Sequence, residues 1–262
     1  MRITDENGEL LGHYDSEPAK LLNAGGRSPF LLLGDHAGNA IPRKLGNLGV
    51  SEADRQRHIA WDIGVREIGE RLAARLDAAF VHQSYSRLVV DCNRDPVSAE
   101  AIVEVSDGTV VPRNALLDAR AREERIGAIH APYHRAIAKV LEDRTALGRE
   151  TILISLHSFT PSMDGQSRPW EIGVLYSEGD TIFARALLQA LDQAVDGPVG
   201  DNQPYQMDST DYTVPLHAFA ARLPYAELEM RQDLVGDVEG QALWSDRLVQ
   251  ALDVARLKAK LA

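Results

Sequence analysis

Residues 151–157 read T-I-L-I-S-L-H, an apolar run of strand-forming residues that leads directly into His157. Continuous apolar runs of this length are typical of strands that are buried on both faces, as in a parallel sheet. Residues 29–34 (P-F-L-L-L-G) form a second such run, and the loop that begins after it contains His36. Each of the two runs therefore predicts a buried strand with a histidine at its carboxyl end.

Strand and helix patterns alternate along the rest of the chain. Val65, Ile68 and Leu72 recur at helical spacing in a segment that extends to about residue 78. We expect further strands at residues 80–83, 87–91, 172–176 and 224–230, and further helices at 126–141, 182–195 and 242–261. This alternation predicts an α/β sandwich with a mixed, largely parallel sheet, in which ligand sites lie beyond the carboxyl ends of the strands.

The composition is that of a globular protein with room for a sizeable core. Of the 262 residues, 44% are hydrophobic and 26% are charged. The sequence has no repeat, low-complexity tract or Gly/Ser-rich linker, so we expect a single domain over residues 1–262. An excess of 39 acidic over 28 basic residues gives a formal net charge of −11, which disfavours nucleic acid as a partner.

Hydropathy and cysteine content narrow the class further. No apolar run approaches the roughly 18 residues of a membrane span, so we expect a cytoplasmic protein without a membrane partner. Cys92 is the single cysteine, which excludes an internal disulfide and a cysteine-rich zinc site. A metal would therefore be bound by histidine and carboxylate side chains. The sequence leaves the oligomeric state open.

Chemically capable side chains follow several of the predicted strands. Four of them come just after a strand: His36, Asn93, Arg94 and His157. Glu227 and Glu229 share one face of a later strand because they are two residues apart. Two histidines with carboxylates nearby can bind zinc and leave one position for a nucleophilic water, and the planar fork of Arg94 matches a carboxylate. These residue types predict a metal-dependent hydrolase for an acylated amino acid.

Five motifs between about residues 30 and 235 carry a resemblance to a known family. They are D-H-A-G-N-A-I-P (35–42), H-I-A-W-D-I-G (58–64), S-R-L-V-V-D-C-N-R-D-P (86–96), S-L-H-S-F (155–159) and E-L-E-M-R-Q-D-L (227–234). In this order they resemble the N-formylglutamate amidohydrolase family. The resemblance implies a three-layer α/β/α sandwich similar to that of zinc carboxypeptidases and aspartoacylases. It also implies a zinc-dependent amidohydrolase of histidine degradation, which converts N-formyl-L-glutamate to formate and L-glutamate.

The resemblance also implies ligands for one zinc ion. His36 matches the histidine of a His-x-x-Glu pair, whereas Asn39 stands where the relatives have glutamate. Neutral asparagine is a poorer zinc ligand than a carboxylate, so we nominate Asp62 as the third ligand and keep Asn39 as its alternative. His157 resembles the later histidine ligand at a strand end.

The same resemblance suggests roles in substrate binding and catalysis. Asn93 and Arg94 resemble a pair that grips the carboxylate of a small-molecule substrate. Apart from the resemblance, His58 and His217 are further candidates for substrate contact. Arg87 is a candidate for the substrate or the oxyanion. Glu229 resembles the glutamate that takes a proton from water and delivers it to the leaving amine. Glu227 is its competitor for that role.

Other readings of these residues stay open. Arg94 can instead form a structural ion pair with Asp91 or Asp95. At the level of the whole protein, Asn39 favours a catalytically silent carboxylate-binding protein on the same fold. A deacylase for another N-acyl amino acid and an amidase that uses Cys92 are further alternatives.

Overall fold

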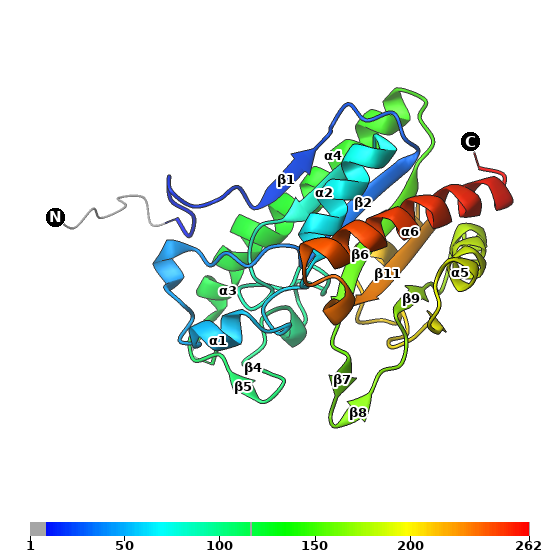
Figure 1. The fold of residues 1–262 in the computed structure, drawn as a ribbon. Coiled ribbons are helices and arrows are strands. Elements are labelled where there is room, and N and C mark those ends of the chain that lie inside the picture. Colours follow the sequence, from blue (N-terminus) through cyan, green and yellow to red (C-terminus); the bar gives the residue numbers. More distant parts are fainter. Residues whose placement is uncertain (1–8, 116, 262) are drawn as a thin grey trace.

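A seven-stranded mixed sheet crosses the molecule in the computed structural model, which describes residues 9–115 and 117–261 (Figure 1). Its strands are β1 (Ala19–Leu22), β2 (Phe30–Gly34), β3 (Ala79–Gln83), β6 (Ile152–Phe159), β9 (Ile172–Leu175), β10 (Val199–Asp201) and β11 (Tyr225–Arg231). They lie in the order β1-β3-β2-β6-β11-β9-β10. The pairs β2/β3, β2/β6, β6/β11 and β9/β10 are parallel, and β1/β3 and β9/β11 are antiparallel. The mixed, largely parallel sheet predicted from the alternating pattern is confirmed.

Helices cover both faces of the sheet. They are α1 (Glu52–Arg55), α2 (Val65–Leu76), α3 (Ala119–Arg125), α4 (Ala131–Ala146), α5 (Ile182–Ala194) and α6 (Val238–Lys258). The long helix α6 packs against both α2 and α5 in front of the sheet, and α4 lies behind it against β1 and β3 (Figure 1). This arrangement is the expected three-layer α/β/α sandwich.

Close packing of α2 on the sheet depends on a small residue. Gly69 lies in the middle of α2, and a Cβ atom added there would come within 2.2 Å of the Phe80 ring on β3. The helix begins after Gly64, whose φ of 84° is in the left-handed region that favours glycine. These two glycines let α2 begin next to the site and approach the sheet closely.

Two hairpins project from the sandwich near the carboxyl ends of β2 and β6. One hairpin consists of β4 (Val105–Ser106) and β5 (Thr109–Val110), and the other of β7 (Ser162–Met163) and β8 (Gln166–Ser167). Figure 1 shows them next to each other at the bottom of the molecule. In the described part of the chain, none of the helices has the length and apolar character that a membrane crossing needs.

The predicted strand at residues 87–91 is wrong. Leu88, Val89 and Val90 are buried as expected, but their backbone forms a turn in which Val89 N–H donates to the Ser86 carbonyl. The Ser86 hydroxyl accepts from Leu88 N–H and donates to the Ala60 carbonyl, which also accepts from Arg87 N–H, so the segment is held by a turn and by a distant loop and not by a neighbouring strand. The residues that follow therefore approach the site from a loop.

Two boundaries also differ from the predictions. Strand β6 continues to Phe159, so His157 lies within the strand and pairs in register with Glu229 of β11. The helix predicted at residues 126–141 is a π-helical turn (Ile126–His130) followed by α4. The π-helical segment is a single turn, too short to interrupt the helical spacing of apolar residues visibly, so the sequence predicted one helix.

Candidate active site

A cavity of about 420 Å³ lies where β2, β6 and β11 end. Because β6 pairs in parallel with both of its neighbours, the three carboxyl ends meet at one edge, where α/β folds place their ligand sites. The charged and imidazole side chains in its wall are His36, His58, His157, Arg87, Arg94, Asp62, Asp208, Asp211, Glu227 and Glu229. With Asn93, which also lines it, the cavity collects seven of the eight predicted site residues.

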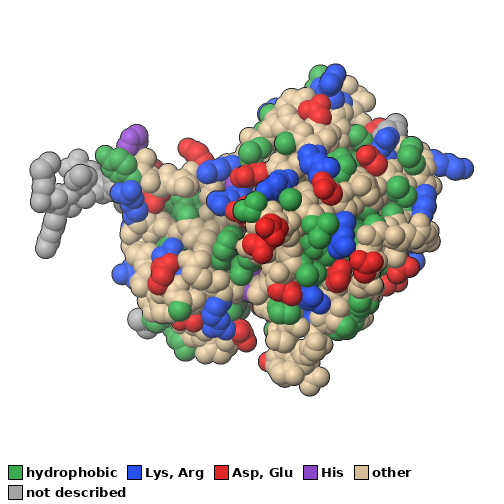
Figure 2. All heavy atoms as spheres, in the orientation of Figure 1, with side chains coloured by type: hydrophobic (Ala, Val, Ile, Leu, Met, Phe, Trp, Pro, Cys, Tyr) green, Lys and Arg blue, Asp and Glu red, His purple; other side chains and the backbone are tan. Residues whose placement is uncertain are grey.

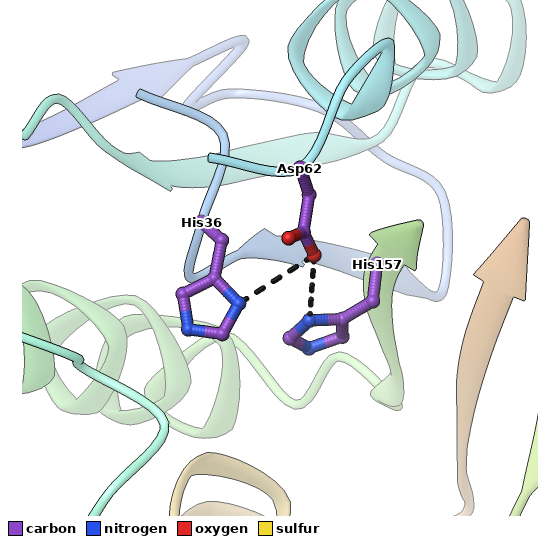
Figure 3. A group of neighbouring side chains, drawn as sticks. All are labelled: His36, Asp62 and His157. Carbon is purple, nitrogen blue, oxygen red and sulfur yellow. Dashed lines mark hydrogen bonds and ion pairs between the residues drawn. The ribbon is translucent and has the colours of Figure 1, made fainter. Parts of the chain in front are cut away.

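Three of these side chains form a compact group that can hold a metal ion (Figure 3). His36 Nδ1 lies 3.5 Å from Asp62 Oδ2, and His157 Nδ1 lies 3.2 Å from the same oxygen. One ligand atom from each residue lies within 4.8 Å of the others, and all three side chains are buried. Figure 3 shows both imidazoles directed toward the Asp62 carboxylate.

The three side chains come from separate segments that backbone hydrogen bonds connect. His36 follows β2, His157 lies on β6, and Asp62 precedes α2. The backbone N–H of Asp62 donates to the His36 carbonyl at 2.9 Å, which fixes the two loops to each other. The backbone N–H of Ser158 donates to Asp62 Oδ2 at 3.2 Å and orients the carboxylate.

The outer nitrogens of both histidines face further carboxylates. His36 Nε2 lies 2.7 Å from Asp91 Oδ1, and His157 Nε2 lies 3.4 Å from Asp35 Oδ2. Tyr133 donates a hydrogen bond of 2.6 Å to the other oxygen of Asp35. Carboxylates in this position fix the ring orientation of metal-binding histidines and strengthen them as ligands. In the described structure the buried Nδ1 of His36 has no hydrogen-bond partner, which fits a metal ligand.

The protonation behaviour of the two histidines reflects these anions. Burial and the nearby Arg87 oppose protonation of His36, but the carboxylates of Asp91 and Asp62 outweigh them and raise the pKa of His36. Burial also opposes protonation of His157, yet its carboxylate neighbours raise its pKa well above the ordinary value. Such an anionic environment favours a cation between the two rings.

Two carboxylates of β11 face the same cavity. Burial raises the pKa of Glu229 to about 7 and raises the pKa of Glu227 well above its ordinary value. Glu227 Oε2 lies 3.9 Å from His157 Nε2, on the side of that ring turned away from Asp62. Glu229 has no ion-pair partner in the described part of the chain, and its buried Oε2 is free of hydrogen bonds there. Within the described residues, Glu227 Oε2 is also free of hydrogen bonds, so the two carboxylates differ in that Glu227 contacts His157 and Glu229 has no ion pair.

Arg87 lies in the wall of the cavity and contacts the metal-type group, by which we mean His36, Asp62 and His157. Its Nε and Nη2 donate to Asp91 Oδ2 at 3.1 and 2.8 Å, and its Nη1 donates to Asp62 Oδ1 at 3.4 Å. Burial works against the charged form, but the two carboxylates raise the pKa of Arg87. This guanidinium therefore keeps its charge in the wall of the cavity.

Asn93 and Arg94, which we call the anion clamp, hold a loop that borders the cavity. Asn93 Oδ1 accepts hydrogen bonds from Tyr212 N–H and Thr213 N–H at 3.0 and 2.9 Å. Arg94 Nη1 donates to the Thr210 carbonyl at 3.0 Å. The ion-pair partners of Arg94 are Glu100 and Asp211, each at 3.7 Å, and not the Asp91 or Asp95 considered from the sequence.

Two candidates from the sequence lie elsewhere. His217 is outside the described wall of the cavity, and its Nε2 lies 3.0 Å from His134 Nδ1. The structure therefore does not bring it to the proposed substrate site. Asn39 donates to the Arg55 carbonyl at 2.7 Å and is not part of the metal-type group, whereas Asp62 is. Of the two proposed third ligands, the geometry favours Asp62.

Sequence reasoning missed several residues that shape the site. Asp35 and Asp91 lie within the quoted motifs, but spacing alone does not say which histidine each contacts. His58, a candidate for substrate contact, lies in the cavity wall; its Nδ1 lies 3.5 Å from Asp62 Oδ1, and burial lowers its pKa to about 4. Asp211 carried no detectable signal because its contacts depend on how a distant loop folds back.

Comparisons with known proteins agree with this architecture. A family model of N-formylglutamate amidohydrolase matches residues 28–235. A crystal structure of a gene product of Agrobacterium tumefaciens is 32% identical, with a TM-score of 0.92 over 96% of this chain and all of that chain. The structure of an N-formylglutamate amidohydrolase from Ralstonia eutropha is 18% identical, with a TM-score of 0.68 over 94% of this chain and 99% of that one.

No curated protein matched the sequence. The family match nevertheless spans most of the chain, including the segments that carry His36, Asp62, His157 and Glu229. The chain belongs to the N-formylglutamate amidohydrolase family.

Proposed function

We propose that the protein is a zinc-dependent hydrolase that cleaves N-formyl-L-glutamate to formate and L-glutamate, a step of histidine degradation. The observation that carries the proposal is the arrangement of His36 and His157. Each ring turns Nδ1 toward Asp62 while a carboxylate lies at its Nε2. Imidazole and carboxylate ligands suit zinc better than they suit magnesium, which prefers oxygen ligands alone.

Three side chains would hold the ion: His36, Asp62 and His157. When bound, zinc acts as a Lewis acid on the amide carbonyl and lowers the pKa of water. The site residues leave room for both because their ligand atoms border an open cavity.

The protein side chains supply the proton transfers. Glu229 accepts a proton from water as the water oxygen bonds to the formyl carbon. Arg87 stabilises the negative charge that develops on the carbonyl oxygen. Glu229 then returns the proton to the amide nitrogen, the C–N bond breaks, and formic acid and the amine are released; the acid ionises to formate and the amine takes up a proton. The anion clamp holds the substrate carboxylate during both steps.

A second cavity favours one alternative, a deacylase for acyl groups longer than formyl. This outer cavity has a volume of about 540 Å³ and shares five wall residues with the first: His58, Arg87, Arg94, Tyr205 and Thr210. Its apolar wall consists of Ile59, Leu88, Val103 and Met163. Figure 2 shows the molecule hollowed between the two projecting hairpins, whose residues Ser106 and Met163 line this cavity. An acyl chain extending beyond the carbonyl would find apolar contacts there.

Formate release from N-formyl-L-glutamate tests the proposal, together with the zinc content of the purified protein. We expect about one zinc per chain, turnover that chelation abolishes and turnover that zinc restores. N-acetyl-, N-butanoyl- and N-hexanoyl-L-glutamate, assayed in parallel, distinguish the deacylase alternative by a preference for the longer chain. Zinc-free protein that binds carboxylates without turnover, even after zinc is supplied, would contradict the proposal and indicate the silent binding protein.

The reading that uses Cys92 as a nucleophile has little structural support. The Cys92 side chain is buried, and burial raises the pKa of its thiol well above the ordinary value. A thiolate is the reactive form, so this environment disfavours it as a nucleophile. We expect a thiol alkylator to leave turnover unchanged under native conditions.

A further inference from the structure

The anion clamp already holds a carboxylate that belongs to the protein. Asn93 Nδ2 donates to Asp211 Oδ1 at 3.2 Å, and Arg94 Nη1 lies 3.7 Å from the same oxygen. The Asp211 side chain is 12% exposed and lines the catalytic cavity. An amide donor and a guanidinium that converge on one carboxylate oxygen are the groups that would bind a substrate carboxylate.

The local backbone fixes Asp211 in this position. Its second oxygen, Oδ2, accepts a hydrogen bond from Asp208 N–H at 3.1 Å. On the opposite side, Asn93 Oδ1 accepts the two backbone N–H groups of Tyr212 and Thr213 that follow Asp211. Five hydrogen-bonding or ion-pair contacts thus join Asp211 and its loop to the clamp and to each other.

The cavity that contains the contact between Asp211 and Arg94 carries more negative than positive side chains. Five carboxylates line the cavity against two guanidiniums: Asp62, Asp208, Asp211, Glu227 and Glu229 against Arg87 and Arg94. Arg87 is engaged by Asp62 and Asp91. Arg94 is therefore the guanidinium in the described cavity wall that is not paired with the metal-type group. A substrate carboxylate that reaches Arg94 meets the negative charge of Asp211 at the same place.

We propose that Asp211 is an internal ligand of the anion clamp, which a substrate carboxylate must displace or share in order to bind. The inference rests on the proposed function, in which Asn93 and Arg94 bind that carboxylate. Asp211 then sets how tightly the site binds anions and selects for substrates whose carboxylate can compete with it. It acts on binding and not on the bond-breaking step, because its contacts are with the clamp and not with Glu229 or the metal-type group.

The substitution Asp211→Asn tests this role because it removes the charge and keeps the shape and an oxygen acceptor. Glu100→Gln is a matched control: Glu100 also lies 3.7 Å from Arg94, but it is exposed and lies outside the wall of the catalytic cavity. Asp211→Ser provides a second variant in case the asparagine disturbs the loop. Thermal denaturation shows whether each variant is folded.

Glutarate binding to the zinc-loaded proteins, measured by calorimetry, gives a readout that does not need turnover. We expect Asp211→Asn and Asp211→Ser to bind glutarate at least about fivefold more tightly than the wild type, because a charge close to the clamp no longer opposes the ligand. Glu100→Gln should change the affinity less than about twofold, since it is exposed to solvent. For N-formyl-L-glutamate, the KM of the Asp211 variants should fall while kcat stays within about twofold of the wild type.

The outcomes separate the two proposals. Wild-type protein that does not hydrolyse N-formyl-L-glutamate contradicts the proposed function, and glutarate binding still decides the role of Asp211. Three results would overturn the proposal that Asp211 is an internal ligand. They are equal glutarate binding by the wild type and the Asp211 variants, absence of binding in both, and an equal gain in affinity in Glu100→Gln. Weaker binding in the Asp211 variants also overturns it, because Asp211 would then support the ligand site instead of competing for it.

Discussion

Two clusters of buried histidines lie in this molecule, and their surroundings differ in kind. The first, the strand-end cluster, consists of His36, Asp62 and His157. The second, the helical cluster, consists of His130, His134 and His217, whose rings contact one another through His134 with centroids 4.5 and 5.3 Å apart. Carboxylates surround the strand-end cluster, whereas the helical cluster contacts backbone carbonyls, its own rings and the rings of Tyr133 and Tyr212.

The two environments move the pKa values in opposite directions. Burial lowers the pKa of His134 to about 3 and that of His217 to about 4. In the strand-end cluster, neighbouring carboxylates outweigh burial and raise the pKa of both His36 and His157. The carboxylates around the histidines, and a nitrogen free to face a common point, therefore distinguish the strand-end cluster, which can hold a metal ion, from the helical cluster.

The helical cluster nevertheless contacts the backbone of the loop that carries the anion clamp. His134 Nε2 lies 2.9 Å from the Cys92 carbonyl, and His130 Nε2 lies 3.0 Å from the Arg94 carbonyl. These two contacts fix the backbone on both sides of Asn93. The neutral rings thus position the anion clamp, and the carboxylate-bound rings can hold the ion.

Replacing one histidine in each cluster should give the largest contrast. His157→Ala removes a metal ligand, so we expect zinc affinity to fall by more than about 100-fold and turnover to fall to background. His134→Ala should retain about one zinc per chain, because its ring contacts only neutral groups. Zinc content by elemental analysis and formate release measure both effects. Zinc loss in His134→Ala but not in His157→Ala would reverse the assignment of the clusters.

Glu229→Gln separates proton transfer from metal binding within the strand-end site. Loss of the general base should lower kcat by about 10²- to 10⁴-fold while zinc content stays unchanged. In the wild type, the raised pKa of Glu229, about 7, means that the basic form is lost as the pH falls, so kcat/KM should decrease toward acid pH. A pH profile of both proteins measures this, and a variant with wild-type turnover would exclude Glu229 as the base.

Asp91→Asn tests whether the surrounding carboxylates are what distinguishes the strand-end cluster. Asp91 contacts both His36 and Arg87, so its loss should loosen the orientation of the imidazole. We expect zinc affinity to fall by about 10- to 100-fold, with binding still measurable. Competition with a fluorescent zinc chelator gives the affinity. An unchanged zinc Kd would mean that the carboxylate around His36 has no part in metal binding.

The free energy of unfolding should depend on pH through His217 of the helical cluster. The folded pKa of His217, about 4, lies below the ordinary value of 6.5, so the unfolded chain binds a proton that the folded protein does not. Stability from this residue is complete above pH 6.5 and falls as the pH decreases toward 4, by about 1.4 kcal/mol per pH unit. His217→Gln keeps a hydrogen-bonding group next to His134 and should show a correspondingly smaller loss. Urea unfolding at pH 7 and pH 5 measures the difference, and equal losses in both proteins contradict it.

Short-range patterns predicted the elements of the sandwich but not every backbone path between them. Apolar runs identified β2 and β6, and helical periodicity identified α2, because burial of a continuous face leaves a local signal. The run at residues 87–91 gave the same signal but forms a turn, since its apolar side chains are buried while its N–H groups bond within the turn or to other loops and not to a strand. Hydropathy reports burial and not hydrogen-bond partners.

The sequence likewise indicated some residues of the candidate site but not the contacts between them. Runs that lead into His36 and His157 indicated two of the metal-type residues. Asp62 was nominated because Asn39 is a poor zinc ligand, and the family resemblance gave Glu229 its role as the base. The contact of His36 with Asp91 joins residues 55 positions apart, and that of Asn93 with Asp211 joins residues 118 apart. Such contacts depend on how loops fold over one another, and no periodicity in the sequence encodes them. For the same reason His217 was expected at the site and lies in the helical cluster.

Anomalous diffraction at the zinc absorption edge, from crystals of the zinc-loaded protein, tests the metal assignment most directly. We predict one strong peak between His36 Nδ1, His157 Nδ1 and the Asp62 carboxylate, at about 2.0–2.2 Å from each ligand atom. No peak is expected at the helical cluster. A peak between His134 and His217, or none at the strand-end cluster, would contradict the assignment.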